Sequence, residues 1–531
     1  MSLLKKLSTL HNKRERQSSP PWFGLGITVI FLISVALRFW GLGRFNTLVF
    51  DEVYYAKFAN NYLTNTQFFN AHPPLSQYII AIGMWIGSHL PIGQDTVNGL
   101  TGSLRSTWSY RWLNALTGSF IPLVVGALSY ELNRRKPFAL IAALFAATDG
   151  LFLVESRYAL NNVYLVILGL LGQLFFLKAL GRKQRRWLNL ALSGVFFGAS
   201  ACIKWNGLWF LLSAYMLWCA AWTIKWLQKF FKTPLLLPPG TDAAPAHDKH
   251  SASRASSQEA KEQERNSFLS GRQIATRDSR TIATPLQNLT QLKVIPFLWN
   301  FGIIPVVTYS LLWIPHLQMN PEPGFWQAQY DILTFHEKIG DGPKVHPYCS
   351  QWYSWILMWR PVAYFYQTAR DTVEQVPAYP PLPNGSFKYV YDVHAMGNPF
   401  LWWLSTAAIV WLLVLLIKRL VEGMGWKIAP TPSTWIALYF VFGWLANLLP
   451  WVRVTRCTFL YHYMGASVFS GLALAWLVDR WLHSSKTHYR SASITIIFLV
   501  VLAFLFWLPI YLGLPLPVPS YRLRMWFRSW I

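Results

Sequence analysis

Long apolar runs, separated by short clusters of lysine and arginine, dominate the chain from residue 22 to its C-terminal end. A helix needs about 20 mostly apolar residues to cross the hydrocarbon core of a bilayer. Eleven runs fit this pattern, which predicts an all-α polytopic membrane protein with about 11 transmembrane helices. The runs are 22–40, 112–130, 137–154, 160–180, 188–203, 206–226, 294–314, 399–417, 434–451, 458–478 and 491–513.

A twelfth apolar run, residues 75–90, is ambiguous, and the flanking charges decide its placement. The N-terminal segment carries five cations against the single Glu15, so the positive-inside rule predicts that it is cytoplasmic. If 75–90 crossed the membrane, the basic clusters at 134–136 and 182–186 would both lie outside. We therefore expect 75–90 to be an outer juxtamembrane helix, with the segments 41–111 and 315–398 as outward-facing loops.

The polar stretches divide the chain into four parts. Residues 1–21 are predicted to be a basic cytoplasmic N-terminus, residues 22–231 an N-terminal membrane module and residues 293–531 a C-terminal membrane module. Between the modules, residues 232–292 contain Ser, Gln, Ala and mixed charges with few aromatics, a composition that buries too little apolar surface to fold. We expect a disordered cytoplasmic linker there. No small-residue cleavage site follows the run 22–40, so we expect a retained span rather than a signal peptide.

The composition narrows the function. Hydrophobic residues make up 53% of the chain and charged residues 13%, about half the charged share usual in soluble proteins. The formal net charge of +25 lies in short clusters between apolar runs, which is typical of the positive-inside rule, so we expect no nucleic-acid partner. The four cysteines show no CxxC or metal-ligand spacing, and we expect neither a disulfide framework nor a zinc site; they are Cys202, Cys219, Cys349 and Cys457.

Two groups of polar residues follow the first span. Asp51 and Glu52 are neighbours, and adjacent side chains on a helix diverge by about 100°, so they cannot both reach one atom. We expect one carboxylate to be chemical and the other supporting; a solvated helix start is the alternative. His72 precedes Pro73 and Pro74, which would hold it rigidly near the membrane surface, unless it is an incidental residue of a turn.

Four cations lie at the predicted outer ends of spans, namely Arg111, Arg157, Lys204 and Arg456. A single cation in such a place commonly reaches toward lipid headgroups. Four of them on the outer face run against the positive-inside bias, and together they suit a phosphate or pyrophosphate held at membrane depth. Glu155 lies two residues before Arg157, and we expect the two to form a structural ion pair.

The last large outer segment contains the aromatic sequence QWYSW at 351–355, followed by Arg360 and Pro361. Aromatic faces mixed with hydrogen-bonding groups suit sugar rings or a peptide. An aromatic belt at the membrane interface is an equally good interpretation.

Six of these motifs occur in the order seen in protein O-mannosyltransferases, which use polyprenyl-phosphate mannose. The resemblance covers about residues 22–225 and 345–480, and FDE with HPPL and KWNGL is its specific part. The motifs are FDEVYYAKFANNYL, FFNAHPPL, YRWLNALTGSFIPL, ESRYALNNVYL, GVFFGASACIKWNGL and RCTFLYHYMGA.

The resemblance implies a GT-C glycosyltransferase fold whose active site lies on the non-cytoplasmic face. The family's catalytic acidic residue corresponds to Asp51 with Glu52 beside it, and its HPP motif and second-span arginine correspond to His72 and Arg111. The predicted catalytic residues are Asp51 and Glu52; the predicted substrate-binding residues are His72, Arg111, Glu155, Arg157, Lys204, Asn206, Arg456, Tyr461 and His462.

Three features depart from the family pattern. Asn162 stands where the family usually has an acidic residue after the SRxxL stretch. The segment 315–398 is too short for the β-trefoil module of eukaryotic members and looks more like the bacterial type, which suggests a prokaryotic plasma membrane. The linker 232–292 is not associated with the family core.

These features predict an inverting transfer of mannose from polyprenyl-phosphate mannose to Ser or Thr hydroxyls of a protein, with Asp51 as the general base. The expected partners are that donor, the protein acceptor and membrane lipids. No ligand set for a divalent cation is evident at Asp51 and Glu52, so we expect no metal. Two alternatives stay open: a related GT-C enzyme that transfers another lipid-linked sugar, such as aminoarabinose or a hexose, to a lipid or glycan, and a transporter. The absence of a visible internal repeat disfavours a transporter.

Overall fold

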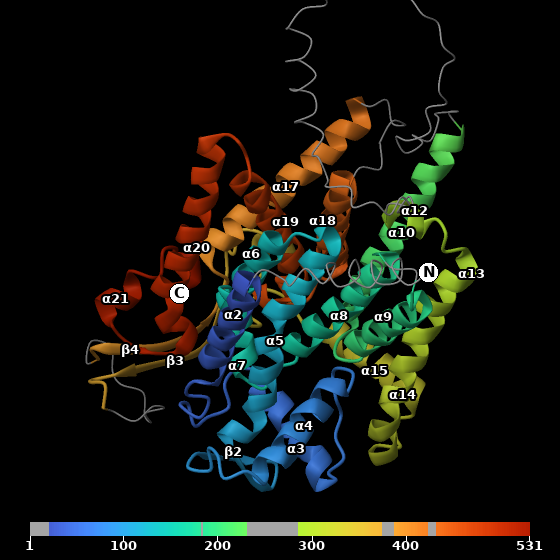
Figure 1. Ribbon diagram of the computed structural model, residues 1–531. Coiled ribbons are helices and arrows are strands. Elements are labelled where there is room, and N and C mark those ends of the chain that lie inside the picture. The colour runs from blue at the N-terminus through green and yellow to red at the C-terminus, as the bar shows by residue number, and fades with distance from the viewer. Residues whose placement is uncertain (1–20, 182–183, 231–284, 374–386, 423–431) are drawn as a thin grey trace, which may run out of the picture.

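The computed structural model describes residues 21–181, 184–230, 285–373, 387–422 and 432–531 (Figure 1). The predicted N-terminal segment, apart from residue 21, and most of the predicted linker lie outside these residues. The N-terminal half consists of α2 (Pro21–Phe39), α3 (Glu52–Thr64), α4 (Leu75–Ser88), β1 (Val97–Leu100), β2 (Ser103–Ser106), α5 (Thr107–Asn133), α6 (Lys136–Ala147), α7 (Gly150–Arg157), α8 (Asn162–Gly181), α9 (Arg186–Ala201), η1 (Trp205–Gly207) and α10 (Leu208–Phe230).

The C-terminal half adds further long helices and a small sheet. Its elements are α12 (Pro285–Leu289), α13 (Val294–Leu298), η2 (Trp299–Ile303), α14 (Ile304–Met319), α15 (Phe325–Lys338), α16 (Trp352–Trp355), β3 (Val362–Ala369), β4 (Tyr389–Ala395), α17 (Pro399–Glu422), α18 (Pro432–Leu448), η3 (Leu449–Arg453), η4 (Leu460–Tyr463), α19 (Met464–Leu482), α20 (Thr487–Leu512), β5 (Pro515–Pro517), α21 (Val518–Arg522) and η5 (Arg528–Trp530).

The helices long and apolar enough to cross a membrane number eight in the described part of the chain, or nine if the bent pair α6–α7 is one span. This is close to the predicted eleven. The other two predicted spans correspond to α9, which has 16 residues, and to α19, which has 19 residues but carries Asp479 and Arg480 and is not apolar enough to be counted. Residues 460–463 of the second of these predicted spans form a 3₁₀ turn before α19 begins at Met464. Helix α4 has 14 residues, too short to cross, as the charge argument predicted for this segment.

The helices form a layered bundle with two distinct ends (Figure 1). Most side chains of α5, α8 and α18 are buried, whereas only a minority of those on α2, α14 and α20 are buried, as expected of helices that face lipid. Helices α3 and α4 and strand β2 lie together at one end, which we call the α3 end. The C-terminal ends of α10 and α17 point toward the opposite end, which we call the α17 end.

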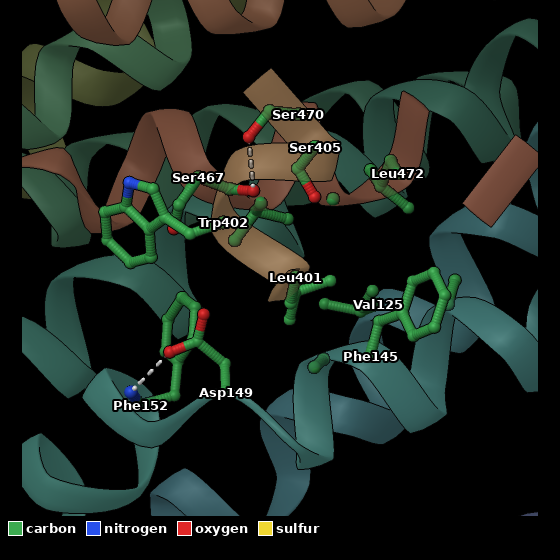
Figure 2. A pocket seen from close by; sticks show the side chains of 14 residues that line it. Val125, Phe145, Asp149, Phe152, Leu401, Trp402, Ser405, Ser467, Ser470 and Leu472 are labelled. Atoms are coloured by element: carbon green, nitrogen blue, oxygen red, sulfur yellow. Dashed lines mark hydrogen bonds between the residues drawn. The ribbon is translucent and has the colours of Figure 1, made fainter. Parts of the chain in front are cut away.

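A sharp break separates α6 from α7, whose axes differ by 57°. Asp149 occupies the break, and its carboxylate accepts a hydrogen bond from the backbone N–H group of Leu151 at 2.9 Å. It also accepts one from the backbone N–H group of Phe152 at 3.3 Å (Figure 2). These hydrogen bonds make Asp149 the cap of α7. Gly150 is needed because a Cβ atom there would lie 2.2 Å from the ring of Tyr511. The adjacent cavity, which is lined by α5, α6, α7, α17 and α19, measures about 30 Å³ and has room for about one water.

Five short strands accompany the helices, and the sequence did not predict them. Strands β1 and β2 form an antiparallel hairpin between α4 and α5. Strand β4 pairs antiparallel with both β3 and β5, with a register shift between Ala363 and Phe365. Both sheets lie in segments that the sequence assigned to loops or to the end of the chain.

The predicted linker is shorter at its C-terminal end than expected. Residues 285–289 form the helix α12, and the side chains of Leu286 and Leu289 are buried. Asn288 donates a hydrogen bond to the carbonyl oxygen of Leu180 at 2.7 Å. The folded part of the C-terminal half therefore begins before residue 293.

Candidate active site

The two neighbouring carboxylates at the start of α3 have opposite surroundings. Asp51 is the N-cap residue of α3, yet its side chain makes no capping bond, and within the described residues its carboxylate has no hydrogen-bond partner. Glu52 is fully buried, and its two oxygens accept bonds from the backbone N–H groups of Val49 and Ala159, each at 2.8 Å, and from Arg111. Of the two acids, Asp51 is therefore the one available for chemistry.

Arg111 supports Glu52 and the chain before α3. Its Nε and Nη2 atoms donate to the Glu52 carboxylate at 2.8 and 2.7 Å. Its other donors bind the carbonyl oxygens of Leu42, Phe45 and Thr47 at 2.8 to 3.1 Å. The guanidinium is buried and fully paired, so this geometry leaves no donor for a phosphate. Instead it fixes the chain between α2 and α3, and thereby Asp51.

Arg157 binds backbone carbonyl groups through Nη1 alone, its buried Nε atom has no hydrogen-bond partner among the described residues, and the predicted Glu155–Arg157 ion pair was wrong. The Arg157 Nη1 atom donates to the carbonyl oxygens of Leu37 and Trp40 at 2.6 and 2.7 Å. These carbonyls lie at the C-terminal end of α2, where they have no helical partner. Glu155 points elsewhere: its carboxylate accepts hydrogen bonds from Asn162 at 3.2 Å and from the Tyr364 hydroxyl.

Lys204 is the cation whose charge acts on Asp51. It is 95% buried, and its Nζ donates to the Asn162 Oδ1 atom at 3.3 Å and lies 5.3 Å from the ring centroid of Tyr461. Burial raises the pKa of Asp51 to about 6, and the positive charge of Lys204 opposes this rise. Burial lowers the pKa of Lys204 to about 8, and Asp51 opposes that change in turn. The structure thus brings these two predicted residues together.

Arg456 belongs to the same cluster. Its pKa is lowered by burial, its side chain is partly exposed, and its Nη1 atom donates to the carbonyl of Cys457 at 3.0 Å. Burial lowers the pKa of Lys204 first, and Arg456 lowers it further, so the two cations act on one site. No carboxylate lies within ion-pair distance of either cation in the described part of the chain.

Histidines line the neighbouring wall. The rings of His72 and His336 lie 5.0 Å apart, and His336 on α15 hydrogen-bonds through Nε2 to the carbonyl of Ala71 at 2.9 Å. Burial, followed by the charge of Arg456, lowers the pKa of His336 to about 4, and burial with Lys204 lowers that of His72. Both rings are therefore neutral near pH 7, and the buried Nδ1 atom of His336 has no hydrogen-bond partner within the described residues.

The remaining predicted residues have packing or lining roles. The ring of Tyr461 packs against the Nζ atom of Lys204. The ring of His462 is 4.5 Å from that of Trp451 and hydrogen-bonds to the Phe459 backbone. Asn206 lines an apolar groove of about 610 Å³ between α9, α10, α14 and α15, two residues from Lys204.

The expectation of no disulfide was wrong. Cys349 and Cys457 form one, with their Cα atoms 5.1 Å apart, although 108 residues separate them in sequence. Backbone hydrogen bonds from Cys457 to Gly340 and from Ser350 to Thr458, each at 2.8 Å, flank it. The bridge therefore fixes the segment that carries Arg456.

Sequence reasoning missed His336 and Tyr364. Tyr364 stacks on Phe50, with ring centroids 4.2 Å apart, and hydrogen-bonds to Glu155. Both residues lie in the outer segment 315–398, which was singled out only for its Trp-rich stretch. Among the described residues there is no group of three or more His, Cys, Asp or Glu side chains that could hold a metal ion.

Two family models match this chain. The model described as "Dolichyl-phosphate-mannose-protein mannosyltransferase" matches residues 28–238. The model described as "C-terminal four TMM region of protein-O-mannosyltransferase" matches residues 322–530. The matches cover most of both halves of the chain and include Asp51, His72, Lys204, His336 and Arg456.

Curated relatives of similar length and one solved structure agree with these matches. The chain is 22% identical over 571 residues to a polyprenol-phosphate-mannose–protein mannosyltransferase of Corynebacterium glutamicum, covering 94% of this chain and 92% of the relative. A relative with the same description from Mycolicibacterium smegmatis is 22% identical over 565 residues, with the same coverage. The Saccharomyces cerevisiae Pmt1–Pmt2 complex bound to the sugar donor shares the fold, with a TM-score of 0.68 at 14% identity over 97% of this chain and 93% of that one.

Proposed function

This chain belongs to the protein O-mannosyltransferase family and is a membrane glycosyltransferase with the GT-C fold, and we propose that it transfers mannose from polyprenyl-phosphate mannose to Ser or Thr hydroxyls of proteins, with inversion and with Asp51 as the general base. The single observation that carries the mechanism is the Asp51 carboxylate, which has no hydrogen-bond partner within the described residues and lies beside the cation Lys204.

The reaction that fits this arrangement takes one step. Asp51 accepts the proton of the acceptor hydroxyl, whose oxygen forms a bond to the anomeric carbon of mannose. The bond between that carbon and the phosphate oxygen breaks on the opposite face of the sugar, and polyprenyl phosphate leaves with the electron pair. Lys204 and Arg456 stabilise the negative charge that develops on the phosphate.

The supporting residues take roles that differ from the expected ones. Glu52 and Arg111 are positioning residues, because their mutual ion pair holds the chain that presents Asp51. Glu155 orients Lys204 through Asn162, so the position where the family usually has an acid carries an amide bridge here. Arg157 anchors the end of α2 and is not placed on the donor.

The donor and its tail fit different surfaces. The neutral rings of His72 and His336 can exchange hydrogen bonds with sugar hydroxyls without competing for the phosphate charge. The apolar groove of about 610 Å³, with Asn206 in its wall, begins next to Lys204 and suits a polyprenyl chain. In this arrangement the donor phosphate lies at Lys204, its mannose at Asp51 and its polyprenyl chain in the groove.

We place the site on the outer face of a prokaryotic plasma membrane. Disulfides persist in oxidising compartments, and the Cys349–Cys457 bridge lies directly beside Arg456. At the α17 end, basic residues cluster at the ends of helices. The positive-inside rule predicts such clusters for a cytoplasmic face. The disulfide and the basic helix ends therefore both support an orientation with the α3 end outside and the α17 end in the cytoplasm.

The test is sugar transfer by purified protein in detergent, with polyprenyl-phosphate mannose and a Ser/Thr-rich peptide, and with the product detected by its mass increase. The wild type should modify the peptide, and Asp51→Asn should be slower by about 10²–10⁴-fold. Asp95→Asn, an exposed carboxylate in the same outer loop, is the matched control and should keep full activity.

Three outcomes would refute parts of this proposal. Full activity of Asp51→Asn would exclude Asp51 as the base. A wild type that consumes the donor and leaves the peptide unmodified would exclude a protein acceptor of this kind, and a wild type that ignores the donor would exclude mannose.

A further inference from the structure

A second polar pocket lies at the α17 end of the bundle, opposite the cluster around Asp51. It has a volume of about 380 Å³ and lies between α17, α18, α19 and α20. Arg419 and Arg480 lie in its wall with the polar side chains of Ser484 and Tyr489, and Trp476 and Leu416 contribute to its apolar part. Nothing in the proposed transfer reaction uses this pocket.

Neither arginine has an acidic partner among the residues that the structure describes. Arg419 donates from Nη1 to the Thr434 hydroxyl at 3.3 Å, and the guanidinium of Arg480 lies 4.8 Å from the ring centroid of Trp476. The acid next to Arg480 in sequence, Asp479, is already bound by Arg135 at 2.6 Å. Across the described residues, no carboxylate lies within ion-pair distance of Arg419 or Arg480.

The pocket also lies at the boundary of the membrane. One apolar span ends at Arg419, a second begins at Ser433 and a third begins at Thr487, so three spans start or stop around it. Its charged part is therefore at the level of lipid headgroups, and its apolar part continues along α17 and α18 toward the hydrocarbon region.

We propose that this pocket binds an anionic phospholipid, with the headgroup phosphate held by Arg419 and Arg480 and the acyl chains lying along α17 and α18. Two guanidinium groups in the wall of one pocket suit a phosphate, and basic pockets between helices at the membrane boundary are typical sites for anionic headgroups. The apolar half of the pocket favours a lipid over a free phosphate ion, because a soluble ion would leave that surface unused.

Native mass spectrometry of the full chain in detergent tests the proposal, with dioleoyl phosphatidylglycerol and dioleoyl phosphatidylcholine as probes. The wild type should retain phosphatidylglycerol in preference to phosphatidylcholine. The double variant Arg419→Gln/Arg480→Gln should bind phosphatidylglycerol at least tenfold more weakly, since each cation near a headgroup contributes a severalfold gain in affinity. Arg419→Lys/Arg480→Lys keeps the charge and should retain part of the binding.

The matched control is Lys178→Gln/Arg490→Gln, which removes two positive charges from helix ends without touching the pocket lining. It should bind phosphatidylglycerol as the wild type does. Equal loss in both double variants would mean a diffuse charge effect and would overturn the site. Displacement of the lipid by equimolar inorganic phosphate, or no preference of the wild type for phosphatidylglycerol, would overturn it as well. Thermal melting without lipid checks that each variant is folded.

Discussion

The opposed pKa shifts of Asp51 and Lys204 predict a bell-shaped pH dependence of mannosyl transfer. The base must be ionised and the phosphate-binding cation must be protonated. Burial raises the pKa of Asp51 to about 6, so the base is lost as the pH falls through that value. Burial lowers the pKa of Lys204 to about 8, so the cation is lost as the pH rises through that value. The active form is therefore most abundant near pH 7.

The size of the effect follows from these two values. At pH 7 about nine-tenths of each group is in the required form, and at pH 5 about one-tenth of Asp51 is ionised. The rate should fall about ninefold between pH 7 and pH 5, and by a similar factor between pH 7 and pH 9 because Lys204 deprotonates. The donor is a phosphodiester and does not titrate in this range.

The assay is kcat/KM for a peptide without titratable side chains, measured from pH 4.5 to 9.5, because this quantity reports the free enzyme. In Lys204→Gln the pKa of Asp51 should rise, since Lys204 lowers it in the wild type. The acid limb should therefore move to higher pH and the alkaline limb should disappear from the residual activity. Lys338→Gln, an exposed lysine on α15, should keep both limbs. A wild-type rate that is equal at pH 5 and pH 7 would refute the assignment of Asp51.

Three further predictions concern the supporting structure. Glu52→Gln leaves Arg111 as an uncompensated buried cation, which should destabilise the fold by about 3–5 kcal/mol and lower its thermal midpoint in detergent; an unchanged midpoint would contradict the scaffold role. His336→Phe removes one neutral hydrogen-bonding group, so the KM for the donor should rise by about 2–12-fold while the acid limb stays near pH 6, and a shifted limb would argue for a different role. Cys349→Ser breaks the disulfide beside Arg456 and should lower the stability by about 2–5 kcal/mol and reduce mannosyl transfer. Cys219→Ser, at an exposed free cysteine, should change neither the stability nor the transfer. Equal behaviour of the two variants would show that the disulfide is dispensable.

The helical body could be predicted from the sequence because a spanning helix is a local pattern. About 20 apolar residues in a row mark it, and the runs at 160–180 and 399–417 correspond to α8 and α17. The sheet β3–β4–β5 could not be predicted in this way, because Pro515 and Leu516 of β5 pair with residues more than 100 positions earlier. The disulfide was missed for the same reason, since its partners are 108 residues apart.

The candidate site was predictable as a set of residues but not as a set of roles. Motif spacing identified Asp51 and Lys204, and the structure brings them together. Motif spacing could not show which cations bind backbone carbonyl groups, because the carbonyl groups that bind Arg111 and Arg157 come from segments more than 60 residues away. Which of two adjacent carboxylates is buried likewise depends on tertiary packing, and Glu52 is the one enclosed by Val49, Ala159 and Arg111.

In the proposed step two cations act on the phosphate, where the sequence predicted four. The chain between α2 and α3 is irregular, and Arg111 and Arg157 satisfy carbonyl groups that have no helical partner there. During transfer Asp51 loses one negative charge as it takes the proton, and the departing phosphate gains one. The total charge of the site stays constant while negative charge moves from Asp51 to the phosphate. A cation that acts on both positions stabilises the charge throughout, which makes the location of Lys204 more important than the number of basic residues around it.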